Sequence, residues 1–134
     1  MHKKSPNLGE IIVKFDAKIL KIRSIGTSDQ TIFQWNRIMD LITFKNTLKE
    51  TQVPKNLPIL VQALWHDAKG DWETAHTIVQ TKEGTLAYDQ IHAYLHRKEG
   101  DKFNANYWYR RIGESMPKIS LEEEWEVLVE RNLV

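Results

Sequence analysis

The sequence predicts an all-α fold for this chain of 134 residues. One motif, Ala-x-x-His-x-x-x-Gly-Asp-x-x-x-Ala, occurs from Ala63 to Ala75 and again from Ala93 to Ala105. The copies lie 30 residues apart, and a fixed period of this length is typical of helical repeats. Apolar residues also follow the spacing of helix faces, and signals for helix ends separate these faces.

Composition and charge are those of a soluble globular protein. Hydrophobic residues make up 41%, charged residues 28%, and the formal net charge is +1. This balance gives no electrostatic reason to expect a nucleic acid or a membrane as partner. The sequence contains no run of about 18 apolar residues, so no membrane-spanning helix is predicted. Cysteine is absent, which excludes thiolate chemistry and is compatible with the cytoplasm, where we expect the protein.

Residues 1–50 are predicted to form a mainly helical N-terminal extension that is separate from the core. A polar tail covers residues 1–7, and the apolar residues of 8–22 have helical spacing. A strand is the alternative, because four apolar residues there also alternate with polar ones: Val13, Phe15, Ala17 and Ile19.

A loop over residues 24–28 precedes a second predicted helix from about Asp29 to Lys49. Its apolar face comprises Ile32, Trp35, Met39, Ile42, Phe44 and Leu48. Because patterning is weak before this helix, we hypothesise that Met39 is the native start and that residues 1–38 are an over-long reading of the gene. Tryptic peptides from residues 1–38 in native cells would refute this hypothesis.

Residues 57–134 are predicted to form a helical-repeat domain after a linker that contains Pro54. We expect Asn56 to cap the first helix, with Pro58 in its first turn, where the missing N–H costs nothing. Gly70 ends this helix, because glycine readily adopts the left-handed conformation of a helix terminus. Its apolar face comprises Leu57, Leu60, Val61, Leu64, Trp65 and Ala68.

The next helices follow the same plan. Asp71 is a predicted N-cap, since its carboxylate can accept the free N–H groups of a first turn. The buried face of the helix that follows comprises Trp72, Ala75, Ile78 and Val79. A turn over residues 82–84 leads to a helix from about Leu86 to Lys98, which Gly100 ends.

Two further helices complete the chain. Asp101 is expected to cap a helix that runs to about Arg111. Ser120 and Glu123 form a capping box, in which serine caps the helix and glutamate lies three residues later. The last helix is expected to bury Leu121, Trp125, Leu128 and Val129 and to expose Glu122, Glu123, Glu126 and Glu130, as the capping helix of an array does.

The repeated motif resembles the tetratricopeptide helix–turn–helix, in which small residues let two helices approach closely. Ala63 and Ala93 would lie opposite Ala75 and Ala105. The period of 30 is shorter than the family's roughly 34 residues. The resemblance implies antiparallel helical hairpins with a C-terminal capping helix.

A second resemblance covers residues 57–134 and concerns a group of small bacterial proteins. It depends on the strings at residues 63–72, 92–101 and 107–111 and on Leu-Glu-Glu-Glu-Trp at 121–125. The resemblance implies a bacterial, soluble protein and carries no particular activity.

Histidines are the candidate chemical groups. His92 and His96 are four residues apart on a predicted helix, so their imidazoles share a face and could ligate a metal ion. His66 or Asp67 of the preceding repeat could supply a third ligand. A purely structural role is the alternative, in which His66 and His96 pack between helices. A small metal-binding protein or enzyme would therefore use His66, His92 and His96.

We predict an interaction module for a protein or peptide, because stacked hairpins form a concave surface and no complete catalytic motif is present. Candidate contacts, if exposed, are His92, Tyr94, Arg97 and Arg110. The string Tyr-Trp-Tyr-Arg-Arg at 107–111 could bind single-stranded nucleic acid, but we expect Trp108 and one tyrosine in the core instead. No phosphate-binding or dinucleotide motif predicts a cofactor, and the oligomeric state is not predicted.

Overall fold

The computed structural model describes residues 29–133, with side chains from Ile38 onward. Every regular element in this range is a helix, which confirms the all-α prediction. The chain divides into two units, residues 1–46 and 47–134. The predictions for residues 1–28 lie outside the described residues. Within the described part, none of the helices combines the length and apolarity needed to cross a membrane.

The first unit contains α2, Asp29–Thr47, close to the predicted helix. The predicted apolar face is wrong in part. Met39 is 51% exposed, whereas Ile38, Leu41 and Phe44 are buried. These three residues are spaced by three, so they lie along one side of the helix.

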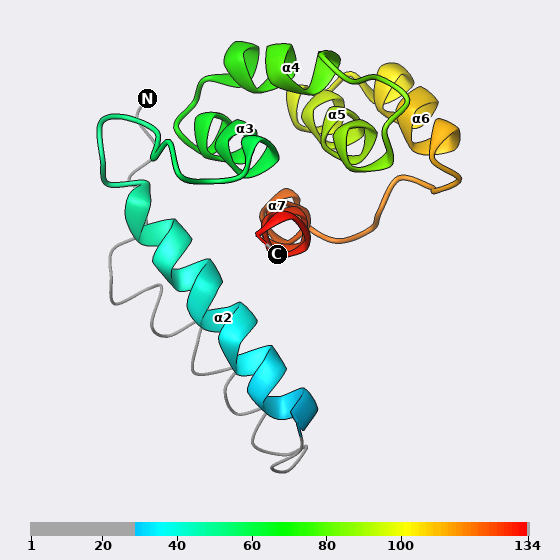
Figure 1. Cartoon of the computed structure of the whole chain (residues 1–134). Coiled ribbons are helices and arrows are strands. Elements are labelled where there is room, and N and C mark those ends of the chain that lie inside the picture. Colours follow the sequence, from blue (N-terminus) through cyan, green and yellow to red (C-terminus); the bar gives the residue numbers. More distant parts are fainter. Residues whose placement is uncertain (1–28, 134) are drawn as a thin grey trace. The chain divides into compact units, whose positions relative to one another are not determined.

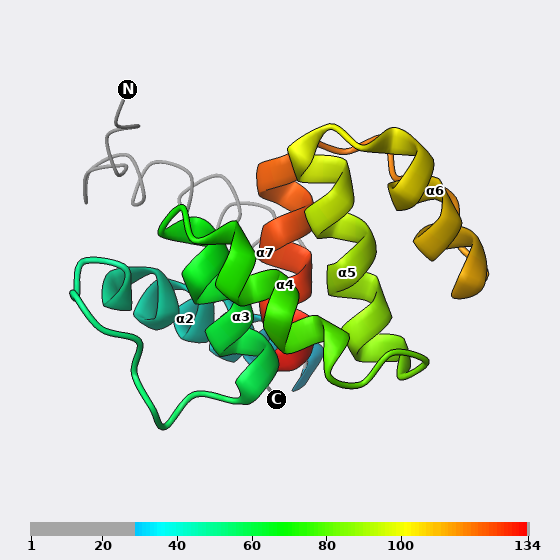
Figure 2. The same cartoon turned by 90° about the horizontal axis from the view of Figure 1, so that it is seen from above.

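The second unit contains α3 (Ile59–Ala68), α4 (Trp72–Gln80), α5 (Leu86–Glu99), α6 (Lys102–Arg111) and α7 (Leu121–Asn132). Consecutive helices pack as two pairs, α3 with α4 and α5 with α6. The pairs meet where α5 contacts α4 and α3, and α7 packs against both α3 and α5 (Figures 1 and 2).

Local signals set the helix ends of this unit. Asp71 and Asp101 accept hydrogen bonds from the backbone N–H groups of Thr74 and Asn104, each at 3.1 Å. Ser120 caps α7 in the same way. The predicted Asn56 cap is wrong, because Pro58 is the N-cap residue and α3 begins at Ile59. A residue before proline is disfavoured in helical conformation, so Leu57 stays outside the helix.

The repeated alanines lie in the interior of the second unit. Ala63, Ala75, Ala93 and Ala105 all have 0% exposure, as the motif predicts. A larger side chain at these positions would force the helices apart.

Two buried carboxylates connect helices within the unit. Asp67 of α3 accepts a hydrogen bond from the Tyr94 hydroxyl and pairs with Lys98, both on α5. Glu124 of α7 pairs with Arg97 and accepts a hydrogen bond from the Tyr109 hydroxyl. The Trp125 indole N–H also donates to the Leu64 carbonyl, at 3.0 Å. Asp67 and Glu124 therefore each have both a cation and a tyrosine as partners.

Candidate functional site

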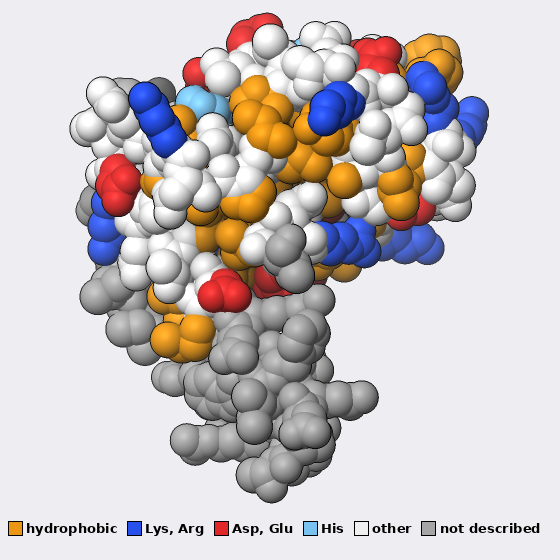
Figure 3. All heavy atoms as spheres, in the orientation of Figure 1, with side chains coloured by type: hydrophobic (Ala, Val, Ile, Leu, Met, Phe, Trp, Pro, Cys, Tyr) orange, Lys and Arg blue, Asp and Glu red, His pale blue; other side chains and the backbone are white. Residues whose placement is uncertain are grey.

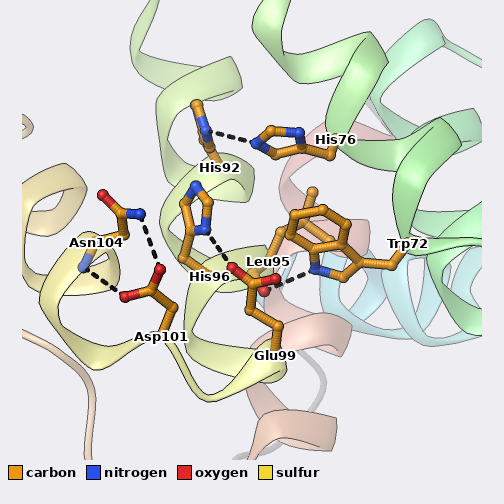
Figure 4. A network of polar contacts seen from close by, with 8 residues as sticks. All are labelled: Trp72, His76, His92, Leu95, His96, Glu99, Asp101 and Asn104. Atoms are coloured by element: carbon orange, nitrogen blue, oxygen red, sulfur yellow. Dashed lines mark hydrogen bonds and ion pairs between the residues drawn. The ribbon is translucent and has the colours of Figure 1, made fainter.

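Three histidines from two helices come together in the second unit. His76 lies on α4, and His92 and His96 lie one turn apart on α5 (Figure 4). Each offers one ring nitrogen, and these nitrogens lie within 4.8 Å of one another. We call these three residues the histidine cluster.

The closest approach in the histidine cluster joins the Nε2 atoms of His76 and His92, which are 3.1 Å apart. The His76 ring meets the other two nearly edge-on, while the His92 and His96 rings are stacked, with centroids 4.9 Å apart. Helical spacing explains the stack, because residues four apart on a helix are neighbours on one face.

Glu99 orients one ring of the cluster. His96 Nδ1 is 2.8 Å from Glu99 Oε1. The carboxylate is an acceptor, so Nδ1 carries the proton and Nε2 of the neutral ring keeps its lone pair. Metal-ligating histidines commonly have such a carboxylate on the second ring nitrogen.

Two tryptophans flank the cluster. The Trp72 ring stacks on His76 with centroids 4.5 Å apart, and the Trp108 ring stacks on His92 at 3.9 Å. Trp72 is itself held by a 2.8 Å hydrogen bond from its indole N–H to the Leu95 carbonyl (Figure 4). These contacts restrict the rotation of both imidazoles.

Burial keeps two rings of the cluster, those of His76 and His92, uncharged. It lowers the pKa of His92 to about 4, with smaller contributions from His96, His76 and Arg111. Burial, followed by His96, also lowers the pKa of His76. Both rings are therefore neutral at pH 7, which is the form that binds metal ions.

One atom of the cluster is not satisfied by the protein. Nδ1 of His92 is buried and has no hydrogen-bond partner among the described residues. An unpaired buried polar atom costs about 1–3 kcal/mol. Packing alone therefore does not explain a histidine at this position.

The structure separates the histidines that the sequence analysis grouped. His92 and His96 are together as predicted, but His66 is in no ligand group within the described residues. Its Nδ1 lies 4.0 Å from Asp71 Oδ2, and its ring meets Trp65 edge-on. The third member of the cluster is His76 instead.

The sequence analysis missed His76 because it lies outside the repeated histidine position. It follows Ala75, and the second copy of the motif has Asn106 at the corresponding place. A usable signal was present, since α4 and α5 are consecutive helices and each carries ring side chains four residues apart.

The predicted contact residues have different surroundings. His92 and Tyr94 are each 2% exposed, so neither can contact a partner protein. Arg97 is engaged by Glu124 and the Ile119 carbonyl. Arg110 is exposed in the last turn of α6. Trp108 and Tyr109 are buried, as predicted.

Two other places in the unit are weaker candidates. His96, Glu99 and Asp101 form a second potential ligand group, but Asp101 is already engaged by Asn104 as the cap of α6. A cavity of about 90 Å³ is lined by residues that include Tyr109 and Glu124, and no histidine lines it. The histidine cluster is therefore the candidate site.

Comparison with known proteins identifies no relative: no family model, curated protein or solved structure matches this chain.

Proposed function

We propose that the protein binds one divalent transition-metal ion, of the zinc class, through His76, His92 and His96. The carrying observation is that three ring nitrogens from two helices lie within 4.8 Å of one another. Two of the rings are neutral at pH 7 because burial lowers their pKa values. Glu99 supports the third.

The donor set restricts the class of ion. Imidazole nitrogens suit zinc, copper, nickel and iron, whereas magnesium and calcium prefer oxygen ligands. The absence of cysteine excludes thiolate ligation. Zinc is the reference ion. Copper is expected to bind more tightly, because among the divalent first-row metals Cu²⁺ has the highest affinity for a given set of nitrogen ligands.

The spacing of the cluster is compatible with coordination after a small movement. Zinc–nitrogen bonds of about 2.0–2.1 Å in a tetrahedral site place two nitrogens about 3.4 Å apart. The His76–His92 separation of 3.1 Å is near this value. The other nitrogen pairs lie within 4.8 Å. Side-chain rotations that move a nitrogen by about 1.5 Å would bring these pairs to the spacing of a tetrahedral site.

Zinc titration of untagged, chelator-treated protein tests the proposal. Calorimetry is expected to give one zinc per chain, and His76→Gln or His92→Gln is expected to weaken binding at least tenfold. The matched control is His66→Gln, which removes a histidine outside the cluster and leaves binding unchanged. No binding by the wild type, or an equal loss in His66→Gln, would reject the site.

We further propose that the two helix pairs are tetratricopeptide-like hairpins. The fully buried alanines and the glycine–aspartate turns support this proposal. One feature departs from an open array: α7 packs against α3 and α5, the first helices of both pairs. The cytoplasmic location stays a prediction.

A protein or peptide partner is the second candidate function, and the exposed side of α6 favours it. Phe103 is 86% exposed, and Tyr107 is exposed one turn later. The charged residues of α6 are all basic: Lys102, Arg110 and Arg111. Figure 3 shows hydrophobic and basic side chains side by side over α6, at the upper right. Such a surface suits an acidic partner with apolar side chains.

Site-specific photo-crosslinking in native cells tests this second candidate. A crosslinker at Phe103 is expected to capture a defined partner that one at the exposed residue Glu83 does not. Equal capture from both positions, or none, would contradict a docking surface on α6.

A further inference from the structure

We propose that the ion bound by the histidine cluster joins the two helix pairs, so that metal binding and release control how firmly α4 is held against α5. This inference rests on the proposed metal binding and adds a structural consequence to it.

The ligands are divided between the two pairs. His76 belongs to α4 of the first pair, and His92 and His96 belong to α5 of the second. An ion bound to all three would connect elements that the chain otherwise joins through the exposed turn at residues 81–85. The ion therefore acts between the pairs rather than within one of them.

Helix α4 has little apolar anchoring of its own. It buries two side chains, Ala75 and Val79, fewer than α3, α5, α6 or α7. Its recorded polar contacts with α5 are the Trp72–Leu95 hydrogen bond and the His76–His92 contact. Helix α3, in contrast, is held to α7 by the Trp125–Leu64 hydrogen bond. Of the five helices of the second unit, α4 therefore buries the fewest side chains, and its polar contacts with α5 come from Trp72 and His76.

His92, whose Nε2 contacts His76 across the α4–α5 interface, also has a buried ring nitrogen, Nδ1, with no hydrogen-bond partner among the described residues. Without metal, only one pair of ring nitrogens in the cluster, those of His76 and His92, is within hydrogen-bond distance. With metal, three bonds to one ion would replace this single contact. The interface gains strength only while the ion is bound.

Linkage determines the size of the effect. An ion that needs ligands from both helices binds the docked arrangement and not the undocked one. The ratio of docked to undocked protein then rises by the factor 1 + [metal]/Kd. At free zinc of 100 times Kd, backbone amides that exchange when α4 undocks are expected to exchange about 100-fold more slowly.

Hydrogen exchange of the full chain, with chelator or with buffered zinc, tests this inference. Amides of α4 are expected to slow by about two orders of magnitude, and those of α7 by much less. In His76→Gln, zinc bound by the remaining histidines is expected to leave α4 exchange unchanged. His66→Gln is the matched control and is expected to behave as the wild type.

The possible failures are distinguishable. If calorimetry shows one zinc per chain while α4 exchange is unchanged, the inference is wrong and the proposed metal binding stands. Equal slowing across α3 to α7 would also overturn it, because the ion would then stabilise the whole unit. If zinc does not bind at all, the proposed function itself fails. Should His76→Gln fold poorly, the double variant His92→Gln/His96→Gln removes both ligands of α5 instead, and zinc is again expected to leave α4 exchange unchanged.

Discussion

At the scale of single residues, neighbouring groups determine what each histidine can do. His96 has a carboxylate on Nδ1, and His92 is buried against Trp108, with one ring nitrogen that no described residue bonds. His66 occupies the same motif position as His96 but lies near Asp71, on a capping turn. Residue type and motif position are therefore not enough to identify a metal ligand. The groups around each ring determine whether its nitrogen is available to an ion.

Glu99→Gln tests the role of the carboxylate beside His96. The amide cannot stabilise the positive charge that coordination places on the ring, so zinc affinity is expected to fall about 10- to 100-fold, the usual cost of losing such a partner. Calorimetry with zinc measures the change. Glu123→Gln removes the same charge from the exposed start of α7 and serves as the control. Equal losses in both variants would indicate a general charge effect.

Acidification tests the burial of His92 in the metal-free protein. Its pKa is about 4 in the folded chain, against 6.5 ordinarily, so the unfolded chain takes up a proton first. The contribution is fully present above pH 6.5 and is lost as the pH falls toward 4. Between pH 7 and pH 5, the free energy of unfolding is expected to fall by about 2 kcal/mol.

Urea unfolding in chelator at both pH values measures this fall. The window stops above the range in which the capping aspartates titrate, so those groups contribute little. Besides His92, the charges that face this site are His76, His96 and Arg111. His92→Gln is expected to show a smaller fall. An identical fall in that variant would assign the effect to the other histidines.

At the scale of helices, end signals act locally and repeat. After α3 and again after α5, a glycine with positive φ is followed by an aspartate that caps the next helix. A backbone hydrogen bond that closes the turn also recurs in both places. Asp71 N–H donates to the His66 carbonyl, and Asp101 N–H to the His96 carbonyl. The backbone carbonyls of His66 and His96 thus accept the hydrogen bonds that close the turns, whatever their side chains contact.

Gly100→Ala tests the turn after α5. An added Cβ would meet nothing within 4 Å, so its cost comes from the backbone conformation alone, with φ at +88°. We expect a loss of about 1–2 kcal/mol in the free energy of unfolding. Gly100→Asn is expected to lose less, because asparagine tolerates this conformation better. Urea unfolding measures both, with Ser115→Ala in an exposed loop as control.

At the scale of the whole molecule, α7 changes how the helix pairs are completed. A capping helix at the end of an open array would cover the last pair, yet α7 packs across α3 and α5. The surface lined by α3 and α5 is thus partly covered by the chain itself. This arrangement favours the histidine cluster over the concave surface as the functional site.

A fragment of residues 47–134 tests whether the second unit is independent. It contains α3 to α7, both buried carboxylate networks and all three cluster histidines. We expect cooperative unfolding and zinc affinity within about twofold of the full chain, since no ligand is removed. Urea unfolding and calorimetry measure both. A fragment without a cooperative transition would show that residues 1–46 are needed for folding.

The sequence alone determined the helices of the second unit, the caps of α4, α6 and α7, and the burial of the repeated alanines. Caps, glycine turns and apolar spacing depend on residues a few positions apart, so they can be identified without the rest of the chain. The pairing of His92 with His96 is local in the same way, because one helical turn separates them.

Only the tertiary structure decided which third histidine joins them and where α7 lies. The rotation of α4 about its axis turns His76 toward α5, while the packing of α3 places His66 elsewhere. The position of α7 depends on Trp125 and Glu124 finding partners up to 61 residues away along the chain. Such choices follow from how whole helix surfaces fit together, and no short motif encodes that fit.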